Sequence, residues 1–318
     1  MKKQILTSLL LLLLVLVWNT ARAEFYVIPA GKRAKRTVLV SPKETQFASG
    51  MALLNALNGI TDASSAKPYL IIIEPGIYDI QDQSLVMKSY VDIQGSGEGV
   101  TTITGTINFF TTNLGVVNGA DNSELRFLTI RNQRTSGNAV AVCNRNIGST
   151  MKMLHVTALV NNGSSGERMA VYNANSATTM THVTALAKSI AHNTAIYNVY
   201  GAPVIRDSKI EASGGISCCG VYNYNSTVSI YNTNIRATGG TVNDYGIYNT
   251  GSYFTIKVHG SQIYGYNYSI YQNSTAVSHL GVCMLYKSNS TPGTGGIGTF
   301  DCAQCYDNGY NELNNLCQ

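Results

Sequence analysis

The sequence has few charged residues and a single tryptophan, Trp18. Asp, Glu, Lys and Arg make up 12% of its 318 residues, about half of the usual share. The chain after position 23 contains 19 Lys and Arg residues and 17 Asp and Glu residues, so its net charge is +2. This near balance excludes the basic surface of a nucleic-acid-binding protein. We interpret the one basic cluster, residues 32–36, as a solvated edge, with contact to a polyanion as the alternative.

Only one long apolar run is present, from Ile5 to Val17. Its 13 residues fall short of the roughly 20 needed to cross a bilayer. Basic residues precede the run, and a small-x-small sequence at 21–23 follows it, which is the pattern of a secretory signal. We expect residues 1–23 to be cleaved and the mature chain to reach the periplasm or the medium without a membrane span. A retained anchor is the alternative.

In place of charge, the sequence has Gly, Tyr, Asn, Ser and Thr arranged in repeats. Gly occurs 30 times and Tyr 20 times. An aliphatic-Tyr-amide unit recurs at intervals of 25, 25, 26 and 23 residues. Its copies are Val171-Tyr172-Asn173, Ile196-Tyr197-Asn198, Val221-Tyr222-Asn223, Ile247-Tyr248-Asn249 and Ile270-Tyr271-Gln272, with Val142-Cys143-Asn144 as a variant. A second column reads Thr157-x-Leu159, Thr184-x-Leu186, Ser208-x-Ile210, Thr233-x-Ile235 and Ser261-x-Ile263.

These repeats predict an all-β solenoid. Each period holds at least two strand-like pieces separated by Asn, Ser and Gly turn residues. A unit of this length buries nothing alone and must stack on its copies, and its β-branched, Gly-rich composition with period 2 excludes helical repeats. We therefore predict a parallel β-helix over residues 68–290, with about nine coils stacked roughly 4.8 Å apart.

The stacking assigns a direction to each member of the repeated unit. We expect the core to receive the aliphatic members, Val171, Ile196, Val221, Ile247 and Ile270. Alternation then turns the Tyr column outward, although the opposite assignment, which would bury the tyrosines, stays open. The Asn of each unit can hydrogen-bond the coils above and below it, which avoids a cost of about 1 to 3 kcal/mol for each buried unpaired group.

Both ends of such a solenoid need caps, because open coils expose strand edges and core. In the N-terminal segment, residues 24–67, an amphipathic helix is predicted across the mouth from Phe47, Met51, Leu53, Leu54, Leu57 and Ile60. At the other end, residues 291–318 are predicted as a second, Cys-containing cap. There, disulfides among Cys283, Cys302, Cys305 and Cys317 suit an exported protein. Zinc held by four thiolates is the alternative, and the spacing does not determine the disulfide pairing.

The stretch YLIIIEPGIYDIQDQSLVMKSYVDIQGSGEGVTTITG, residues 69–105, resembles the first coils of the pectin lyase-like superfamily, and within it most closely the pectinesterases. In that family an apolar strand, a Pro-Gly-x-Tyr turn, a second strand and a Gly-x-Gly turn open a right-handed parallel β-helix. The detailed resemblance covers about 40 residues. The repeats extend it, in architecture only, over most of the mature chain, and it implies that the predicted helix is right-handed.

The resemblance does not extend to catalytic motifs. Residues 139–142, Ala-Val-Ala-Val, resemble the strand that follows a catalytic Gln in pectinesterases, but Asn138 stands at the Gln position. The family's Gln-Asp-Thr-Leu, Asp-Phe-x-Phe-Gly and Arg-Pro-Trp motifs are missing. Between residues 125 and 300 the acidic residues are Glu167, Asp207, Glu211 and Asp244, too few for a calcium site of the lyase type or an evident carboxylate pair. We predict no catalytic site, metal or cofactor.

A polar stripe is a candidate binding site. Two or three positions before the second column stand Arg126, His155, His182, Arg206, Tyr231 and His259. The stripe faces solvent if Leu125, Leu154, Ile205, Ile230 and Val258, one place earlier, face the core. An acidic glycan fits it better than a metal, because the Arg residues repel cations. A solvated face without a ligand is the simpler alternative.

The outward tyrosines Tyr172, Tyr197, Tyr222 and Tyr248 are a second candidate, as a flat platform for sugar rings. Stacking of the rings on each other is the structural alternative, worth about 0.5 to 1.5 kcal/mol per pair. Together these features predict an exported, monomeric, non-catalytic protein that binds polysaccharide, including acidic polymers. A pectinesterase-like or pectate lyase-like enzyme with rearranged residues and a structural or adhesin-like surface protein are the alternatives.

Overall fold

The computed structural model describes residues 35–252, 254–273, 275–286 and 293–317. The predicted signal peptide, 1–23, the following residues to 34 and the first two residues of the C-terminal cap lie outside this part. Among the described residues, no helix has both the length and the apolar character needed to cross a membrane.

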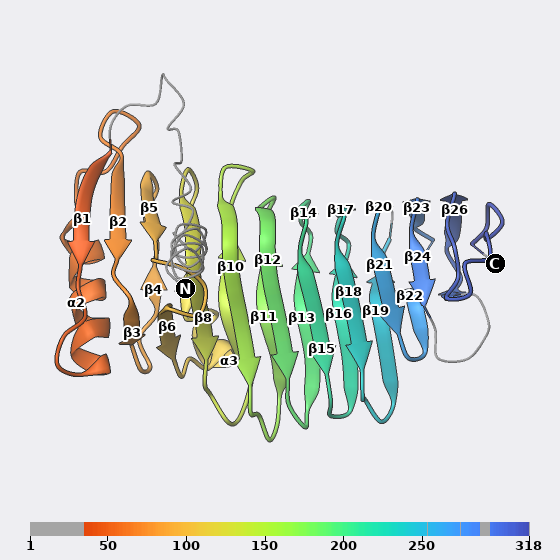
Figure 1. Ribbon diagram of the computed structural model, residues 1–318, viewed down its shortest axis with the longest axis horizontal. Coiled ribbons are helices and arrows are strands. Elements are labelled where there is room, and N and C mark those ends of the chain that lie inside the picture. Colours follow the sequence, from red (N-terminus) through yellow and green to blue (C-terminus); the bar gives the residue numbers. More distant parts are fainter. Residues whose placement is uncertain (1–34, 253, 274, 287–292, 318) are drawn as a thin grey trace, which may run out of the picture. The chain divides into compact units, whose positions relative to one another are not determined.

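The strands form two parallel sheets whose members alternate along the chain (Figure 1). The sheet that we call the tyrosine sheet has nine strands, one per coil: β4 (Leu85–Val86), β7 (Val117–Asn118), β9 (Ala139–Arg145), β11 (Glu167–Ala174), β13 (His192–Val199), β16 (Ser217–Tyr224), β19 (Asn243–Thr250), β22 (Tyr268–Asn273) and β25 (Thr294–Gly296). The predicted solenoid of about nine coils is confirmed.

The second sheet, which we call the bent sheet, has 17 strands. They are β1 (Arg36–Val40), β2 (Tyr69–Ile73), β3 (Gly76–Asp79), β5 (Val91–Gln94), β6 (Thr101–Gly105), β8 (Glu124–Asn132), β10 (Lys152–Asn161), β12 (Thr179–Lys188), β14 (Val204–Arg206), β15 (Lys209–Ser213), β17 (Ser229–Tyr231), β18 (Asn234–Thr238), β20 (Thr255–His259), β21 (Gln262–Gly265), β23 (Val277–Gly281), β24 (Met284–Tyr286) and β26 (Thr299–Ala303). The ladder extends beyond residues 68–290 at both ends, through β1 and β26.

From β8 onward, one residue with a left-handed backbone bends each coil of the bent sheet. The column consists of Phe127, His155, His182, Asp207, Asn232, Gly260 and Val282, with φ between 48° and 63°. Strands β8, β10 and β12 run through this bend, whereas later coils are divided there into pairs such as β14 and β15. The bend turns the wall of the solenoid, so a side chain on each side of it can point into the same core.

The core contains the predicted aliphatic column together with a ladder of buried amides. Val171, Ile196, Val221, Ile247 and Ile270 are buried, which confirms the predicted orientation. The amides point inward two positions later. Each Nδ2 donates to the Oδ1 of the next coil, in the order Asn144, Asn173, Asn198, Asn223 and Asn249, over 2.8 to 2.9 Å. The predicted hydrogen bonds between coils are therefore confirmed.

The N-terminal end is covered by helix α2 (Gln46–Gly59), whose first turn is capped by the Thr45 hydroxyl. Leu53, Leu54 and Leu57 are buried against the first coil, as predicted, whereas Phe47 is 43% exposed. The helix approaches the sheet closely, because a Cβ at Gly50 would lie 2.1 Å from the Asp79 carbonyl oxygen in β3. This position therefore requires glycine. A second, short helix, α3 (Phe109–Thr112), lies beside β9.

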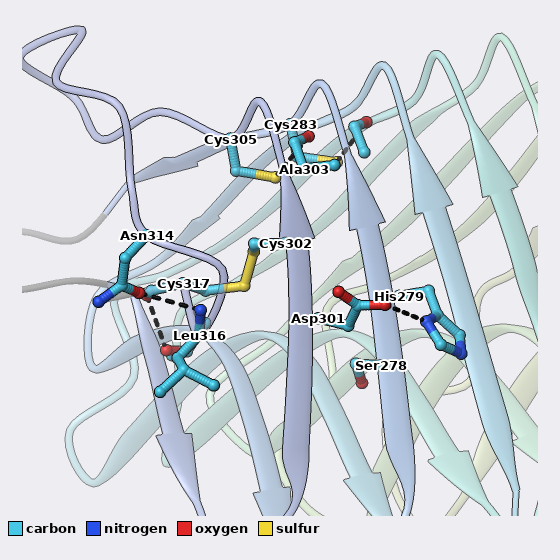
Figure 2. The surroundings of a disulfide bond; sticks show 12 residues. Ser278, His279, Cys283, Asp301, Cys302, Ala303, Cys305, Asn314, Leu316 and Cys317 are labelled. Atoms are coloured by element: carbon cyan, nitrogen blue, oxygen red, sulfur yellow. Dashed lines mark hydrogen bonds and ion pairs between the residues drawn. A yellow bond between two sulfur atoms is a disulfide. The ribbon is translucent and has the colours of Figure 1, made fainter.

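At the C-terminal end, a disulfide joins Cys302 in β26 to Cys317 in the tail (Figure 2). A disulfide in the C-terminal cap was predicted, and it is confirmed. The four-thiolate zinc site is excluded, because two of its four ligands are bonded to each other.

Candidate functional site

The predicted tyrosine column is present on the outer face of the tyrosine sheet. Tyr172, Tyr197, Tyr222, Tyr248 and Tyr271 pair directly in the parallel register. Their ring centroids are separated in turn by 5.7, 4.4, 5.1 and 5.7 Å. All five side chains are half-buried, so the column faces outward as expected.

The rings of this column stack on one another. Tyr197 and Tyr222 are inclined by 14°, and Tyr248 and Tyr271 by only 5°. Their faces are therefore largely covered by neighbouring rings, and their edges and hydroxyl groups remain to meet a ligand. A flat platform for sugar rings, one of the two sequence interpretations, requires open ring faces that the interior of this column does not offer.

A second outward row lies three residues earlier in each coil. Its members in register are Val140, Met169, Thr194, Cys219, Tyr245 and Tyr268. The Tyr245 ring lies 5.1 Å from the rings of both Tyr248 and Tyr271. Strict alternation would point residues three apart to opposite faces, so sequence reasoning missed this row.

The reason is an additional inward residue in each coil. Ala170, Ala195, Gly220, Gly246 and Ser269 are buried and have no partner in the strand register, as in a β-bulge. These small residues face the interior, where a Cβ at Gly220 would lie 2.5 Å from Ile235 Cγ2 in the bent sheet.

Between the tyrosines and a polar column lies an open groove of about 220 Å³. Its walls are formed by Glu167, His192, Asn193, Thr194, Tyr197, Ser217, Cys218, Cys219, Tyr222, Asn243, Tyr245 and Tyr248. Glu167, His192, Ser217 and Asn243 follow one another in register along its edge. A second hollow of about 430 Å³ shares Glu167, Tyr197 and Tyr222 with the first and extends to Phe109 of α3. We call the two together the tyrosine groove.

The tyrosine groove offers neutral hydrogen-bonding groups and little charge. Burial, followed by the neighbouring Tyr271 phenol, raises the pKa of Tyr245 to about 12. Burial also raises the pKa of Tyr197, with Tyr222 as the next cause. These phenols therefore keep their protons at neutral pH. Glu167 is the one carboxylate among the described residues that line the groove.

An exposed apolar ridge borders the polar edge of the groove. Ile190 is 71%, Ile216 42% and Val242 58% exposed. Backbone hydrogen bonds hold the ridge residues at successive levels, from Ile216 N–H to the Ala191 oxygen (3.0 Å) and from Val242 N–H to the Ile216 oxygen (2.9 Å). Aliphatic side chains beside hydroxyl-bearing rings suit a ligand with both apolar and polar surfaces.

The predicted polar stripe is not a single column. Arg126 pairs with Leu154, Thr181 with Arg206, and Arg206 with Tyr231. His155 and His182 belong to the adjacent column of left-handed residues, their rings stacked at 4.6 Å. Leu154 is half-buried and lies in the same column as Arg126, so the condition that it faces the core is not met.

The error comes from aligning Thr184 with Ser208. The structure pairs Thr184 with Lys209, and Ser208 faces the core. A shift of one residue moves a side chain to the opposite face of a strand. Our alignment of the Thr/Ser-x-aliphatic pattern therefore placed the outward Thr184 and the inward Ser208 in one column.

Several basic side chains of the predicted stripe also have protein partners. Arg126 donates to Glu124 Oε1 (2.7 Å) and to Gln94 Oε1 (2.8 Å). The Arg206 guanidinium carbon lies 4.1 Å from the centre of the Tyr231 ring, and His155 Nδ1 lies 3.8 Å from a carboxylate oxygen of Glu98. The described residues contain no group of three or more His, Cys, Asp or Glu suited to a metal ion.

No family model matches the sequence, and no curated protein matches it. Solved structures do match. A pectin methylesterase from carrot is 14% identical and has a TM-score of 0.57, over 84% of this chain and 89% of that one. ORF18 of Geobacillus virus E2 is 11% identical with a TM-score of 0.52, over 84% of this chain, which spans 61% of the viral one. The chain has the pectin lyase-like fold. Its β-helix is right-handed, as the resemblance of residues 69–105 implied.

Within this β-helix, residues 139–142 lie in β9 of the tyrosine sheet, one coil before Tyr172. Asn138, at the position of the pectinesterase Gln, accepts a hydrogen bond through Oδ1 from the Glu167 N–H at 2.9 Å. Its side chain thus ties two coils together at the groove edge.

Proposed function

We propose that the protein is an exported, monomeric β-helix that binds a polysaccharide along the tyrosine groove without cleaving it. The observation that carries this proposal is a long groove across several coils, walled by phenol edges on one side and by polar side chains on the other. Such a groove suits a linear polymer, because successive coils present one tyrosine after another, each about 4.8 Å further along.

The charge of the groove favours a neutral polymer over an acidic one. The groove has the Glu167 carboxyl group in its wall, and its described residues include no Lys or Arg beside it. Sugar hydroxyls can donate to and accept from Tyr, Ser and Asn side chains, and the apolar ridge can cover the C–H surface of a sugar ring.

A binding role fits this groove better than hydrolysis. Glycoside hydrolysis usually needs two carboxyl groups about 5 to 10 Å apart, whereas the described lining of the groove has one. The test of catalysis is direct: the purified mature chain should release neither methanol nor shorter oligosaccharides from pectin. Release of either product would replace the binding proposal with the enzyme alternative.

The binding proposal can be tested by affinity electrophoresis in gels that contain neutral or acidic polysaccharides. Ser217→Arg would fill the groove, and Ser229→Arg is its matched control, since Ser229 is a half-buried Ser in β17 of the bent sheet. We expect a neutral polymer to retard the parent chain and the control, and the Ser217 variant to lose at least tenfold in affinity. Equal retardation of all three would exclude the groove, and retardation of none would exclude polysaccharide binding.

A further inference from the structure

Two of the five cysteines outside the Cys302–Cys317 bond lie at equivalent positions of the last two coils. Cys283 follows the left-handed residue Val282, and Cys305 follows the left-handed residue Gln304. Their neighbours Met284 and Tyr306 form a parallel bridge, and the Tyr306 N–H donates to the Cys283 oxygen at 2.9 Å. Both thiols are buried, and Figure 2 shows them near the Cys302–Cys317 bond.

These thiols continue a column of hydroxyl groups. In earlier coils the same inward position is Ser208, Thr233 or Ser261, and each hydroxyl donates to its own chain two residues earlier. Each also accepts a backbone N–H of the preceding coil, as Ser261 does from Thr233 at 3.1 Å. Cys283 and Cys305 take over this pattern: the Cys283 thiol donates to the Gly281 oxygen at 3.3 Å, and the Cys305 thiol donates to the Ala303 oxygen at 3.8 Å.

We propose that Cys283 and Cys305 form a second disulfide in the exported protein. Directly paired parallel strands lie about 4.8 Å apart, within the Cα separation of about 4.4 to 6.8 Å that a disulfide requires. Two thiols on the same side of adjacent coils need only a small side-chain adjustment. The bond would tie the last coil to the tail that carries the Cys302–Cys317 bond.

The oxidation can proceed by exchange with a small disulfide such as glutathione disulfide. The contact with Cys283 lowers the pKa of Cys305, which favours Cys305 as the attacking thiolate. Cys305 attacks one glutathione sulfur and releases the first glutathione thiolate. Cys283 then attacks the mixed disulfide and releases the second. The two protein thiols lose two electrons and two protons, and both glutathione molecules leave as thiols.

Tryptic mapping of the full chain, folded in an oxidising compartment and digested without reductant, tests the bond. Cleavage after Lys257 and Lys287 places Cys283 in peptide 258–287 and the other three C-terminal cysteines in peptide 288–318. The Cys302–Cys317 bond is internal to the second peptide. We expect the two peptides to be linked, and alkylation in denaturant without reductant to label three of the seven cysteines.

Serine variants identify the partner. Cys305→Ser should abolish the link while preserving the fold, because serine occupies this position in two other coils. The double variant Cys302→Ser, Cys317→Ser should retain the link. Unlinked peptides with five alkylated cysteines would overturn the proposal. Cys283 and Cys305 would then only fill the inward position that serine fills in other coils. A link that survives Cys305→Ser would overturn it as well.

Discussion

At the scale of single residues, the buried amide ladder shows how polar side chains in the core of a chain with few charged residues are hydrogen-bonded. Asn173, Asn198 and Asn223 each donate through Nδ2 to the Asn of one adjacent coil and accept through Oδ1 from the Asn of the other. At the first level, Asn144 Oδ1 has no partner among the described residues. A member in the middle of the ladder leaves two neighbours unpaired when it is removed, which makes the ladder vulnerable at its centre.

Asn198→Leu should therefore destabilise the protein strongly. The change keeps the branched shape and the number of heavy atoms of the side chain but leaves Asn173 Nδ2 and Asn223 Oδ1 buried without partners, at a cost of about 2 kcal/mol or more in the free energy of unfolding. Urea denaturation followed by circular dichroism measures the loss. Asn234→Leu, on the outer face of β18, is the control and should change the free energy by less than about 0.5 kcal/mol. Equal losses would contradict a special role for the ladder.

At the scale of the element, the left-handed bend recurs in every later coil whatever residue occupies it. Gly260 adopts positive φ without strain, and Asn232 does so at low cost. Val282, by contrast, is a β-branched residue at φ 53°, a conformation in which such residues are rarely found. The stacked coils hold Val282 in this conformation, so its backbone is strained, and a substitution can relieve the strain.

Replacing Val282 by Asn should relieve that strain. Val282 is 47% exposed, so little packing is lost, and we expect the free energy of unfolding to rise by about 1 kcal/mol. Val242→Asn provides the matched control, because Val242 is exposed but is not left-handed. Thermal unfolding of both variants measures the change in the free energy of unfolding. A gain in the control equal to that in the Val282 variant, or a loss in the Val282 variant, would refute the strain argument.

How far the sequence predicts this element depends on how distinctive each column is. The Tyr-Asn units can be aligned without ambiguity, because an aromatic residue beside an amide is rare enough to set the register of the coils. The predicted tyrosine column and amide ladder are both confirmed. The bent sheet repeats only Thr or Ser before an aliphatic residue. Thr184 and Ser208 satisfy that pattern from opposite faces, so the predicted Arg-His stripe combined two columns.

Bulges limit prediction on the tyrosine sheet as well. Tyr245 and Tyr268 are turned outward, Tyr245 into the groove wall, by an inward residue that breaks alternation in each coil, Gly246 or Ser269. Small residues at this position are visible in the sequence, but they fit either side of the wall. Only the distance to Ile235 and Ile263 in the opposite sheet shows why they must be small and inward.

At the scale of the whole molecule, the solenoid is a sum of similar coils, each contacting its two neighbours. Val199 and Tyr224 are equivalent positions in β13 and β16. The residues after them, Tyr200 and Asn225, are both left-handed. Deleting residues 200–224 therefore removes one complete coil and joins equivalent points of the chain.

This deletion should leave a folded, shorter β-helix, whereas deleting residues 213–224 should not. The shorter deletion joins the bent sheet to a turn of the tyrosine sheet and destroys the register of every later coil. Far-ultraviolet circular dichroism and resistance to a protease compare the two variants. A protease-sensitive full-coil variant, or a half-coil variant as resistant as the parent chain, would contradict the independence of the coils.

The proposed function requires phenol hydroxyl groups, rather than ring faces, to bind a neutral polysaccharide in the tyrosine groove. Titration calorimetry with an oligosaccharide of the polymer that retards the protein tests it most directly, on a variant in which Tyr197, Tyr222, Tyr245 and Tyr248 are each replaced by Phe. Tyr264→Phe in the bent sheet serves as the control. We expect the fourfold variant to fold, to keep its stacked rings and to lose at least tenfold in affinity. Unchanged affinity would show that the hydroxyl groups do not bind the polymer.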